Sequence, residues 1–487
     1  MNDMQPRLIA SECGYNFVWF GKIFALPHSL GPTDLESADV ASLPGVMIGE
    51  DFYRLRNAVR WRSIAQAPAT PMTSMLNIPA NVELFGGNHP ALAPLFEGTY
   101  EGCIAPNHAT GFSGTSANLA ALDQALQGFR ARMTQAGVPA TAAQSFIERR
   151  DYVSQCIVSA EPGIHFFQGT PLTLGQAPWC VQVEKGTSLF LPFVTAAASW
   201  SFDPMGKDAG IYNIVKTLLG ADECLGIITN IKETADTLPR LFADDRLKEK
   251  IHHLPFFMPA PPVRGPKKTG RFLFTTSWHQ HDRSFYSRGG VDAAMIFAAL
   301  SKRHDDLELI VRCRLPDDLH PEIRAILALP NVSIIDGKID DAEMAQLFAE
   351  AEYYLLPATS LHSMSTLEAM ANGCICILAD SWGSDEYLLH GVNGLRISGR
   401  EGKNWRKDSE RGIVYERYAG LETPDPEFVA RAVTAVEDVL NDSEKRLELS
   451  EAARAWAARN HSPDVVRARF AEIVRAMKER AQRMHHS

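Results

Sequence analysis

Residues 355–395 read LLPATSLHSMSTLEAMANGCICILADSWGSDEYLLHGVNGL, and this stretch decides the fold. A short apolar strand over 353–357 leads into small residues, where a helix is predicted to begin. The helix ends at Asn372 and Gly373, a pair typical of a helix C-terminus. A second apolar strand is predicted over 375–380. A strand, a helix and another buried strand in this order predict part of a parallel sheet.

The start of this helix is a candidate phosphate-binding site. It consists of Ser363, Met364, Ser365 and Thr366. Just past a strand end, free backbone N–H groups and the positive end of the helix dipole favour a diphosphate. Glu368 follows in the second turn, where a carboxylate can reach ribose hydroxyls; the alternative is a surface position on the helix. The stretch therefore predicts the nucleoside-diphosphate site of an enzyme that uses a nucleotide donor.

The second half of the chain repeats the same alternation. Apolar strands are predicted over 271–276, 307–313 and 331–336, and helices over 291–303, 321–329 and 341–351. Strands that are apolar throughout are buried on both faces of a parallel sheet, and such a doubly wound domain has its site at the strands' carboxyl ends. Gly337 and Lys338 follow one of these ends, and their backbone is the candidate for contacts with the nucleotide base.

The first half is legible only in part. Strands are predicted over 163–167, 179–184, 224–230 and 251–257, with helices over 211–219 and 232–242. The proline- and glycine-rich segment 259–270 is the predicted linker. Before residue 151 we expect strands over 16–20, 45–48 and 102–107 and a helix over 116–137; the glycine-rich loop at 111–116 is a binding loop or an ordinary turn. Helices over 427–440, 442–460 and 463–483 end the chain.

The segment around Glu368 resembles the donor-site signature of the retaining GT-B glycosyltransferases of family 4. Residues 367–373 match the motif Leu-Glu-Ala-Met-Ala-x-Gly of that family. Glu386 and the Gly-Val-Asn-Gly segment at 391–394 fall where the family has a Glu and a Gly-x-x-Gly. The family has a pair of glutamates with seven residues between them; the first would stand at Ser360, so the sequence departs from the pattern there. The resemblance covers residues 251–397, with looser agreement back to residue 151.

The resemblance implies an α/β protein of the GT-B class. Two Rossmann-like doubly wound domains would face each other across a cleft, and the C-terminal helix would cross back to the N-terminal domain. The implied divisions are an acceptor-side domain over 1–262, of which 1–150 match poorly, a nucleotide-sugar-binding domain over 263–464, and the crossing helix over 465–487. Glu386 would then lie beside the diphosphate or the sugar; the alternative is a solvated loop carboxylate.

Two arginines after the first strand of the second domain are candidates for the leaving phosphates. The family places an Arg and then a Lys-Gly in this loop, and here Arg283 and Arg288-Gly289 take those places. Arginine keeps the positive charge and adds bidentate hydrogen bonding to phosphate. The alternative is two solvated loop arginines. Without a metal, protein cations of this kind must neutralise the leaving diphosphate.

Glu184 is the candidate catalytic group from the first domain. It ends the strand over 179–184, where the related enzymes often have a His that approaches the donor sugar. A carboxylate there can stabilise positive charge on the sugar or accept a proton from the acceptor. The alternative is an exposed residue that pairs with Lys185. His165 and His108 are secondary candidates, because a lone histidine is more often structural.

Composition excludes several classes. A chain of 487 residues predicts two or three domains, and a net charge of −10 argues against binding to duplex nucleic acid. There is no apolar run of transmembrane length and no secretory signal, so we expect a cytoplasmic protein with at most peripheral attachment to a membrane through the basic end of its last helix. No metal-ligand spacing is present, so neither a metal nor another cofactor is expected.

The sequence thus predicts a metal-independent glycosyltransferase that moves a sugar from a nucleoside-diphosphate sugar to an unidentified acceptor with retention. By the resemblance, polysaccharide or cell-envelope glycoconjugate synthesis is the expected setting. The alternative is a GT-B protein that binds nucleotide sugars without transferring them, because Ser360 replaces the first Glu and Ser363 to Ser365 replace a glycine loop. A phosphorylase that uses pyridoxal phosphate would need a cofactor lysine, for which there is no candidate.

Overall fold

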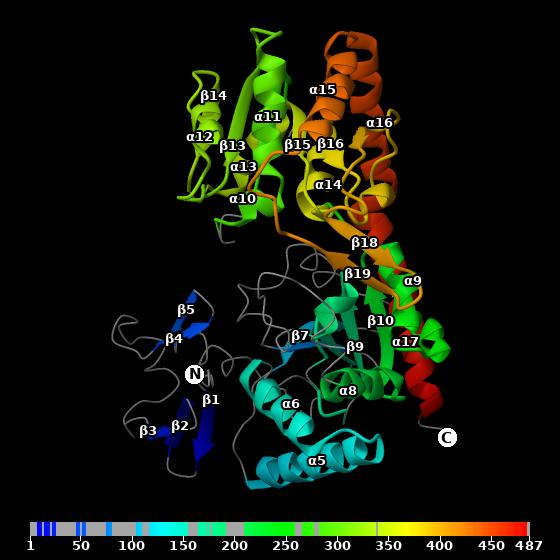
Figure 1. Ribbon diagram of the computed structural model, residues 1–487. Helices are drawn as coiled ribbons and strands as arrows, with labels where there is room; N and C mark the ends of the chain where they lie inside the picture. Colours follow the sequence, from blue (N-terminus) through cyan, green and yellow to red (C-terminus); the bar gives the residue numbers. More distant parts are fainter. Residues whose placement is uncertain are drawn as a thin grey trace.

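Two parallel β-sheets, one in each half of the chain and each packed against helices, make up the body of the protein (Figure 1). The computed structural model describes short strand segments in the first part of the chain, at 7–11, 14–19, 22–25, 45–48, 51–54, 75–79 and 104–109. Beyond these it describes residues 116–153, 164–171, 173–175, 178–190, 209–258, 265–276, 282–337 and 339–484.

Six parallel strands form the sheet of the second half, which we call the C-terminal domain. Its strands are β12 (Lys268–Thr275), β13 (Glu308–Arg312), β14 (Val332–Ile335), β15 (Ala351–Leu356), β16 (Ile375–Ala379) and β17 (Leu395–Ile397). Their order in space is β14-β13-β12-β15-β16-β17, so the direction of winding reverses between β12 and β15. In open parallel sheets, ligands bind at the carboxyl ends of the strands beside such a reversal.

Helices pack on this sheet. They are α10 (Ser284–Ser287), α11 (Gly290–Ser301), α12 (Pro321–Leu327), α13 (Asp341–Glu350), α14 (Ser363–Ala371) and α15 (Pro426–Leu440). Of these, α12, α13 and α15 begin at side-chain caps. Asp340 and Glu343 form a reciprocal capping box at the start of α13. Gly373, with φ 73°, ends α14 in the left-handed conformation that glycine adopts without strain.

The N-terminal domain is built around a second parallel sheet of order β7-β6-β8-β9-β10-β11. Its strands are β6 (Met75–Pro79), β7 (Ile104–Ala109), β8 (Ile164–Gln168), β9 (Trp179–Val183), β10 (Cys224–Thr229) and β11 (Ile251–His253). Its helices are α5 (Ser116–Gln135), α6 (Ala140–Val153), α8 (Ala209–Gly220) and α9 (Lys232–Leu241), with the short 3₁₀ helices η2 (Gly186–Phe190) and η3 (Asp245–Glu249). Two smaller antiparallel sheets precede it: β1 (Arg7–Ser11), β2 (Gly14–Trp19) and β3 (Lys22–Ala25), then β4 (Gly45–Ile48) and β5 (Asp51–Arg54).

The last helix crosses from the C-terminal domain to the N-terminal domain, as expected. After α16 (Ser443–His461), helix α17 (Pro463–Met484) runs along the N-terminal sheet (Figure 1). Phe470 and Met477 of α17 are fully buried against residues of β8, β9 and β10. Arg480, part of the predicted basic end, donates its guanidinium N–H groups to the carbonyl oxygens of Leu225 and Glu249. This arginine therefore fastens the helix to the domain.

A β-hairpin joins the two domains and was not foreseen from the sequence. It consists of β18 (Trp405–Asp408) and β19 (Ile413–Glu416), which pair only with each other. The hairpin leaves the C-terminal domain after β17 and contacts helix α9 of the N-terminal domain (Figure 1). Its position between the domains bears on the site described below.

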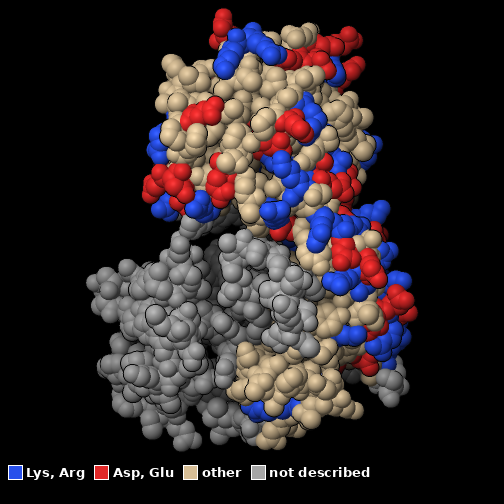
Figure 2. All heavy atoms as spheres, in the orientation of Figure 1, with Lys and Arg blue, Asp and Glu red and all other residues tan. Residues whose placement is uncertain are grey.

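Most of the predicted elements are present, with ends that differ by a few residues. The exception among the strands is 251–257, which is extended only over Ile251–His253. The linker residues 259–264 and the loop 111–115 lie outside the described residues, so the predicted domain boundaries remain predictions. Within the described part of the chain, no helix is long and apolar enough to cross a bilayer. On the face seen in Figure 2, acidic and basic side chains intermingle over the described surface.

Candidate active site

Two loops meet where the strand order of the C-terminal domain reverses. One follows β12 and contains Arg288, and the other follows β15 and leads into α14. The amide and the hydroxyl of Thr359 both donate to the carbonyl oxygen of Ser287, over 3.2 and 3.4 Å. Gly289 has φ 78°, and a Cβ there would lie 2.2 Å from the carbonyl oxygen of Pro357. The two loops are locked together, and they hold Arg288 near the start of α14.

Arg288 is a buried cation, with 6% of its surface exposed. Burial lowers the pKa of Arg288 to about 10, and the neighbouring Tyr354 and Glu184 act in the opposite direction. The guanidinium therefore keeps its charge at neutral pH. A buried guanidinium that keeps its charge can bind an anionic ligand through charge-assisted hydrogen bonds.

Helix α14 begins beside Arg288. Its N-cap residue is His362, whose side chain accepts no hydrogen bond from the first turn. Burial, with Arg288 and Lys185 nearby, depresses the pKa of His362, so the imidazole is neutral at pH 7. The hydroxyl of Ser365 donates to the carbonyl oxygen of His362 over 3.3 Å, and the buried Thr366 hydroxyl has no hydrogen-bond partner among the described residues. The first N–H groups of the helix are thus not taken by a capping side chain.

Glu368 lies one turn further along α14 and is half-buried. Within the described part of the chain, its carboxylate makes no hydrogen bond and no ion pair. Burial, and to a smaller extent the charge of Asp341, raises the pKa of Glu368 to about 7. A desolvated carboxylate with open acceptor positions is suited to hydroxyl donors from a ligand.

Glu184 brings a carboxylate from the N-terminal domain to the same place. It follows directly after β9, and its backbone carbonyl accepts a 2.7 Å hydrogen bond from the hydroxyl of Thr234 in α9. Burial raises the pKa of Glu184; the charges that act on it are those of Lys185, Glu416 and Arg288. Because Arg288 stands after β12 of the other domain, the carboxyl ends of the two sheets meet here.

Lys185 does not form its ion pair with Glu184, the partner that the sequence suggested. Its Nζ lies 2.7 Å from Oε1 of Glu416, at the end of the hairpin. Lys185 also lies over the ring of Trp382, 5.2 Å from the ring centre. Glu416 was missed from the sequence, because a carboxylate at the end of a hairpin carries no local sign that another domain will bury it.

Glu386, which the resemblance places beside the diphosphate or the sugar, contacts the N-terminal domain. It lies in the 3₁₀ helix η4 (Ser384–Glu386) and caps helix α9 of the other domain. Its two carboxylate oxygens accept the N–H groups of Lys232 and Glu233, over 2.8 and 3.0 Å. Burial raises the pKa of Glu386, and these two N–H groups oppose the shift. The contact ties the domains together, and no ligand is needed to satisfy this carboxylate.

Arg283 lies at the surface, whereas Arg288 is buried. It is half exposed, and its Nη2 lies 3.0 Å from Oδ2 of Asp318. Its guanidinium carbon also lies 5.3 Å from the ring centre of Tyr286, whose hydroxyl donates to Asp318 over 3.0 Å. Of the two predicted arginines, the structure buries only Arg288 and brings only Arg288 close to Glu184.

Of the remaining predicted residues, Ser360, Ser363 and Met364 lie in the loop after β15 and at the start of α14. Ser363 is buried at the start of α14, and Met364 is half-buried. Ser360 is buried in a bridge to Trp382, and its side chain is one of the groups that lower the pKa of Glu416. Gly337 follows β14, while Lys338 lies outside the described residues.

The two secondary histidines lie on strands of the N-terminal sheet. His108 is in β7 and His165 in β8. His165 is paired with Trp179 of β9 and Asn77 of β6 in the sheet register.

Comparison with known proteins supports a glycosyltransferase. Residues 291–407 match the family model described as Glycosyl transferases group 1. This range includes β15 and α14, whereas β12 and Arg288 precede it. This match spans about a quarter of the chain. No curated protein is significantly similar to the chain in sequence.

Several solved structures resemble the chain at low sequence identity. A glycosyltransferase from Rickettsia africae is 12% identical with a TM-score of 0.48, and the match covers 84% of this chain and 99% of that one. Anabaena Alr3699/HepE, solved with UDP and glucose, is 12% identical with a TM-score of 0.45, covering 82% and 98%. In the GtfA/B complex, with 16% identity and a TM-score of 0.45, the match covers 68% of this chain and 60% of that one. With TM-scores below 0.5, these likenesses carry no conclusion about this chain. Its own two Rossmann-like domains, with a last helix that crosses back to the first domain, have the arrangement of a GT-B fold.

No metal site stands out near the junction. Among the described residues, no group of three or more His, Cys, Asp or Glu side chains is arranged to hold a metal ion. Arg288 and Lys185 contribute positive charge near the junction.

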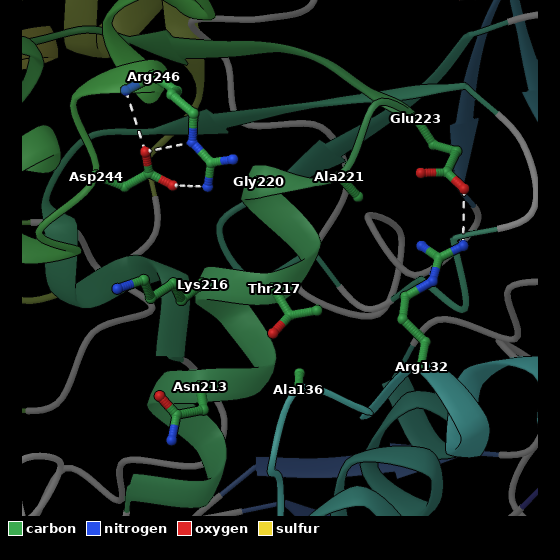
Figure 3. A pocket seen from close by; sticks show the side chains of 10 residues that line it. All are labelled: Arg132, Ala136, Asn213, Lys216, Thr217, Gly220, Ala221, Glu223, Asp244 and Arg246. Atoms are coloured by element: carbon green, nitrogen blue, oxygen red, sulfur yellow. Dashed lines mark hydrogen bonds and ion pairs between the residues drawn. The ribbon is translucent and has the colours of Figure 1, made fainter. Parts of the chain in front are cut away.

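A separate cavity of about 540 Å³ lies in the N-terminal domain, between α5, α8 and η3 (Figure 3). Four of its charged side chains are already paired: Arg132 with Glu223 over 2.7 Å, and Arg246 with Asp244 over 2.6 Å. It is lined by the C-terminal end of α8, away from the strand ends that carry Glu184. This cavity is therefore not part of the site around Arg288.

Proposed function

We propose that the protein transfers a sugar from a nucleoside-diphosphate sugar to an acceptor, with retention of the anomeric configuration and without a metal. The observation that carries the proposal is the meeting of Arg288 and the start of α14 with Glu184 from the other domain. A diphosphate needs cations and free N–H groups, and a transfer reaction also needs a group that faces the acceptor side. In this junction, Arg288 and the start of α14 supply the cation and the N–H groups, and Glu184 supplies the group on the acceptor side.

In this proposal the C-terminal domain binds the donor. The first turn of α14, from Ser363 to Thr366, offers N–H groups to the diphosphate, and Arg288 supplies the charge. Glu368 accepts hydrogen bonds from the ribose hydroxyls, and the backbone near Gly337 and Lys338 faces the base. Negative charge grows on the leaving diphosphate as the glycosidic bond breaks, so Arg288 and the N–H groups stabilise the transition state more than the bound donor.

Glu184 acts from the N-terminal domain. Its raised pKa makes it a better proton acceptor than an ordinary carboxylate, because a base works best when its pKa lies closer to the working pH. We assign it the proton of the acceptor hydroxyl, or alternatively the positive charge that develops on the sugar. The acceptor would be held by the N-terminal domain, and a cytoplasmic role in polysaccharide or cell-envelope glycoconjugate synthesis remains the expected setting.

The proposal is tested by the release of nucleoside diphosphate from UDP-glucose, UDP-N-acetylglucosamine, GDP-mannose and ADP-glucose. We expect turnover of at least one of the four. Glu184→Gln should keep donor affinity, because the phosphate and ribose contacts lie in the other domain, and should lose about two to four decades in rate. Binding of a nucleotide sugar with no turnover, alone or with an added acceptor mixture, would instead indicate a binding protein.

A further inference from the structure

The hairpin β18–β19 is firmly rooted in the C-terminal domain. Arg400, which precedes it, has 3% of its side chain exposed and forms an ion pair with the buried Asp292 of α11. Its backbone N–H donates to Asp380, and the indole N–H of Trp405 donates to the carbonyl oxygen of Asp380 over 2.6 Å. A buried ion pair and two hydrogen bonds thus fix the direction in which the hairpin leaves its domain.

The far end of the hairpin belongs to the N-terminal domain by its contacts. Ile413 is buried in the apolar core of that domain. A Cβ at Gly412 would lie 2.3 Å from the carbonyl oxygen of Thr237 in α9, so the turn packs directly on the helix backbone. Lys407 lies 2.5 Å from Glu233, and Arg240 donates to the carbonyl oxygen of Ser409 over 2.8 Å. The hairpin is therefore a bridge with both ends fixed.

This bridge ends at Glu416, beside the proposed catalytic carboxylate. The side chain of Glu416 is 8% exposed, and it accepts from Lys185 over 2.7 Å and from the hydroxyl of Tyr418 over 2.8 Å. These donors keep Glu416 ionised: although burial opposes them, its pKa is lowered. Lys185 directly follows Glu184 in sequence, so it could form an ion pair with either Glu184 or Glu416. In this structure it pairs with Glu416.

We propose that Glu416 is a positioning residue for the reaction: it retains Lys185 across the domain boundary and so leaves the Glu184 carboxylate unpaired and able to take up a proton. This inference rests on the role proposed above for Glu184. Among the described cations, Lys185 acts most strongly on Glu184, so without Glu416 it would pair with Glu184. A carboxylate paired in this way is a weaker base and offers fewer acceptor positions.

The electrostatic surroundings of Glu184 agree with this arrangement. Lys185 and Arg288 favour its ionised form, and Glu416 opposes it. Tyr387 also lies close enough for Glu184 to act on its hydroxyl, and the neutral His362 lies near Lys185 and Arg288. Removal of Glu416 would take away a negative charge and release a positive one, and both changes lower the pKa of Glu184.

The first test compares Glu416→Gln with the wild type, using the nucleotide sugar of the four that is turned over fastest. We expect kcat to fall by tenfold or more while the donor KM stays the same, and the acid limb of the pH–rate profile to move to lower pH. Glu410→Gln is the matched control, because this exposed glutamate makes the same chemical change on the turn of the same hairpin. Wild-type kcat and an unmoved acid limb in Glu416→Gln would overturn the proposal.

A rescue experiment distinguishes positioning from a general loss of structure. In Lys185→Met/Glu416→Gln, no lysine is left to pair with Glu184, so most of the rate lost in Glu416→Gln should return. A hairpin that merely holds the domains together predicts the opposite, because the double variant has lost both halves of the ion pair. A double variant as slow as Glu416→Gln, or slower, would overturn the proposal.

A second measurement does not depend on turnover. The unfolding midpoints of Glu184→Gln, Glu416→Gln and the double variant, measured from pH 5 to pH 8, form a double-mutant cycle. We expect a coupling that changes with pH, whereas the cycle of Glu184→Gln with Glu410→Gln should be additive. Additive midpoints for Glu184 and Glu416 at every pH would contradict the inference. Absence of turnover with all four donors would count against the proposed function. The double-mutant cycle would then still test whether Glu416 acts on Glu184, because it does not require turnover.

Discussion

At the scale of a residue, Glu368 is a candidate binding group that both the sequence and its burial single out. The sequence identified it from its place in a helix that follows a strand, and the structure adds that its carboxylate has no partner in the described part of the chain. Arg288 was likewise predicted, but only the structure separates it from Arg283, which is paired with Asp318 at the surface. Two arginines five positions apart have the same local sequence signal, and burial depends on contacts that are distant in the chain.

The raised pKa of Glu368 predicts a pH dependence of donor binding. Its pKa of about 7 in the free protein means that half of the carboxyl groups are protonated at neutral pH. Ribose hydroxyls need the ionised form as an acceptor, so affinity for UDP-glucose or another bound nucleotide sugar should rise about tenfold from pH 6 to pH 8. Calorimetry of Glu368→Gln, which cannot ionise, should show weaker and pH-independent binding. The same pH dependence in the variant would assign the titration to another group.

The same pKa has a consequence for stability. The pKa is raised in the folded protein, so between about 4.5 and about 7 the folded state binds more protons than the unfolded state. The contribution of Glu368 to the free energy of unfolding is therefore full below this window and is lost as the pH rises through it. Glu368→Gln should remove this part of the pH dependence, measured by denaturant unfolding between pH 4.5 and pH 8. An unchanged slope would show that Glu368 is not buried as described.

Arg288 is expected to act on the leaving diphosphate. Arg288→Lys keeps a positive charge there, whereas Arg288→Ala leaves the growing negative charge uncompensated. We therefore expect Arg288→Ala to lower kcat more than Arg288→Lys, by at least tenfold, in a nucleotide-release assay at saturating donor. Arg283→Ala is the comparison, and its effect should be smaller, because Arg283 is paired at the surface. Equal rates for the three variants and the wild type would remove Arg288 from the mechanism.

At the scale of the element, the sequence predicted the strands and helices whose formation depends on neighbouring residues in the chain. The apolar strands and capped helices of the C-terminal domain were foreseen because their burial and caps are set within a few residues. The hairpin β18–β19 was not foreseen, since its alternation is short and its partner is a helix of the other domain. Strand β6 was missed for a similar reason: Met75–Pro79 contains an Asn and ends in Pro, and only its neighbours β7 and β8 make it a central strand.

The contact of Glu386 with the start of α9 predicts a loss of stability when Glu386 is replaced. It caps α9 from the other domain, because Ile231 at the N-cap has no side-chain acceptor of its own. Loss of an N-cap costs about 0.5–2 kcal/mol, so Glu386→Ala should lower the free energy of unfolding by that amount. The exposed neighbour Asp385 supplies the control, Asp385→Ala, which should have little effect in the same denaturation experiment. A Glu386→Ala variant as stable as the control would show that water can replace the cap.

At the scale of the whole molecule, the two domains are joined by contacts that the sequence does not announce. Glu386 on α9, the hairpin on the N-terminal core and α17 on the N-terminal sheet all connect segments more than a hundred residues apart. The arrangement brings Glu184 to Arg288 and takes Lys185 away from Glu184. The sequence could predict two Rossmann-like domains and a donor site, but which charges meet between the domains depends on how these contacts set one domain against the other.

The central claim is that the junction at α14 and Arg288 binds a nucleoside diphosphate. Titration calorimetry of the wild type and of Glu368→Ala with UDP, GDP and ADP at pH 8 tests it most directly. We predict that at least one of the three binds the wild type, and that Glu368→Ala, still folded, binds it about ten to a hundred times more weakly, because hydrogen bonds to a charged acceptor are worth about 1.5–3 kcal/mol. No binding of any of the three to the wild type, or equal affinity in the variant, would contradict the account.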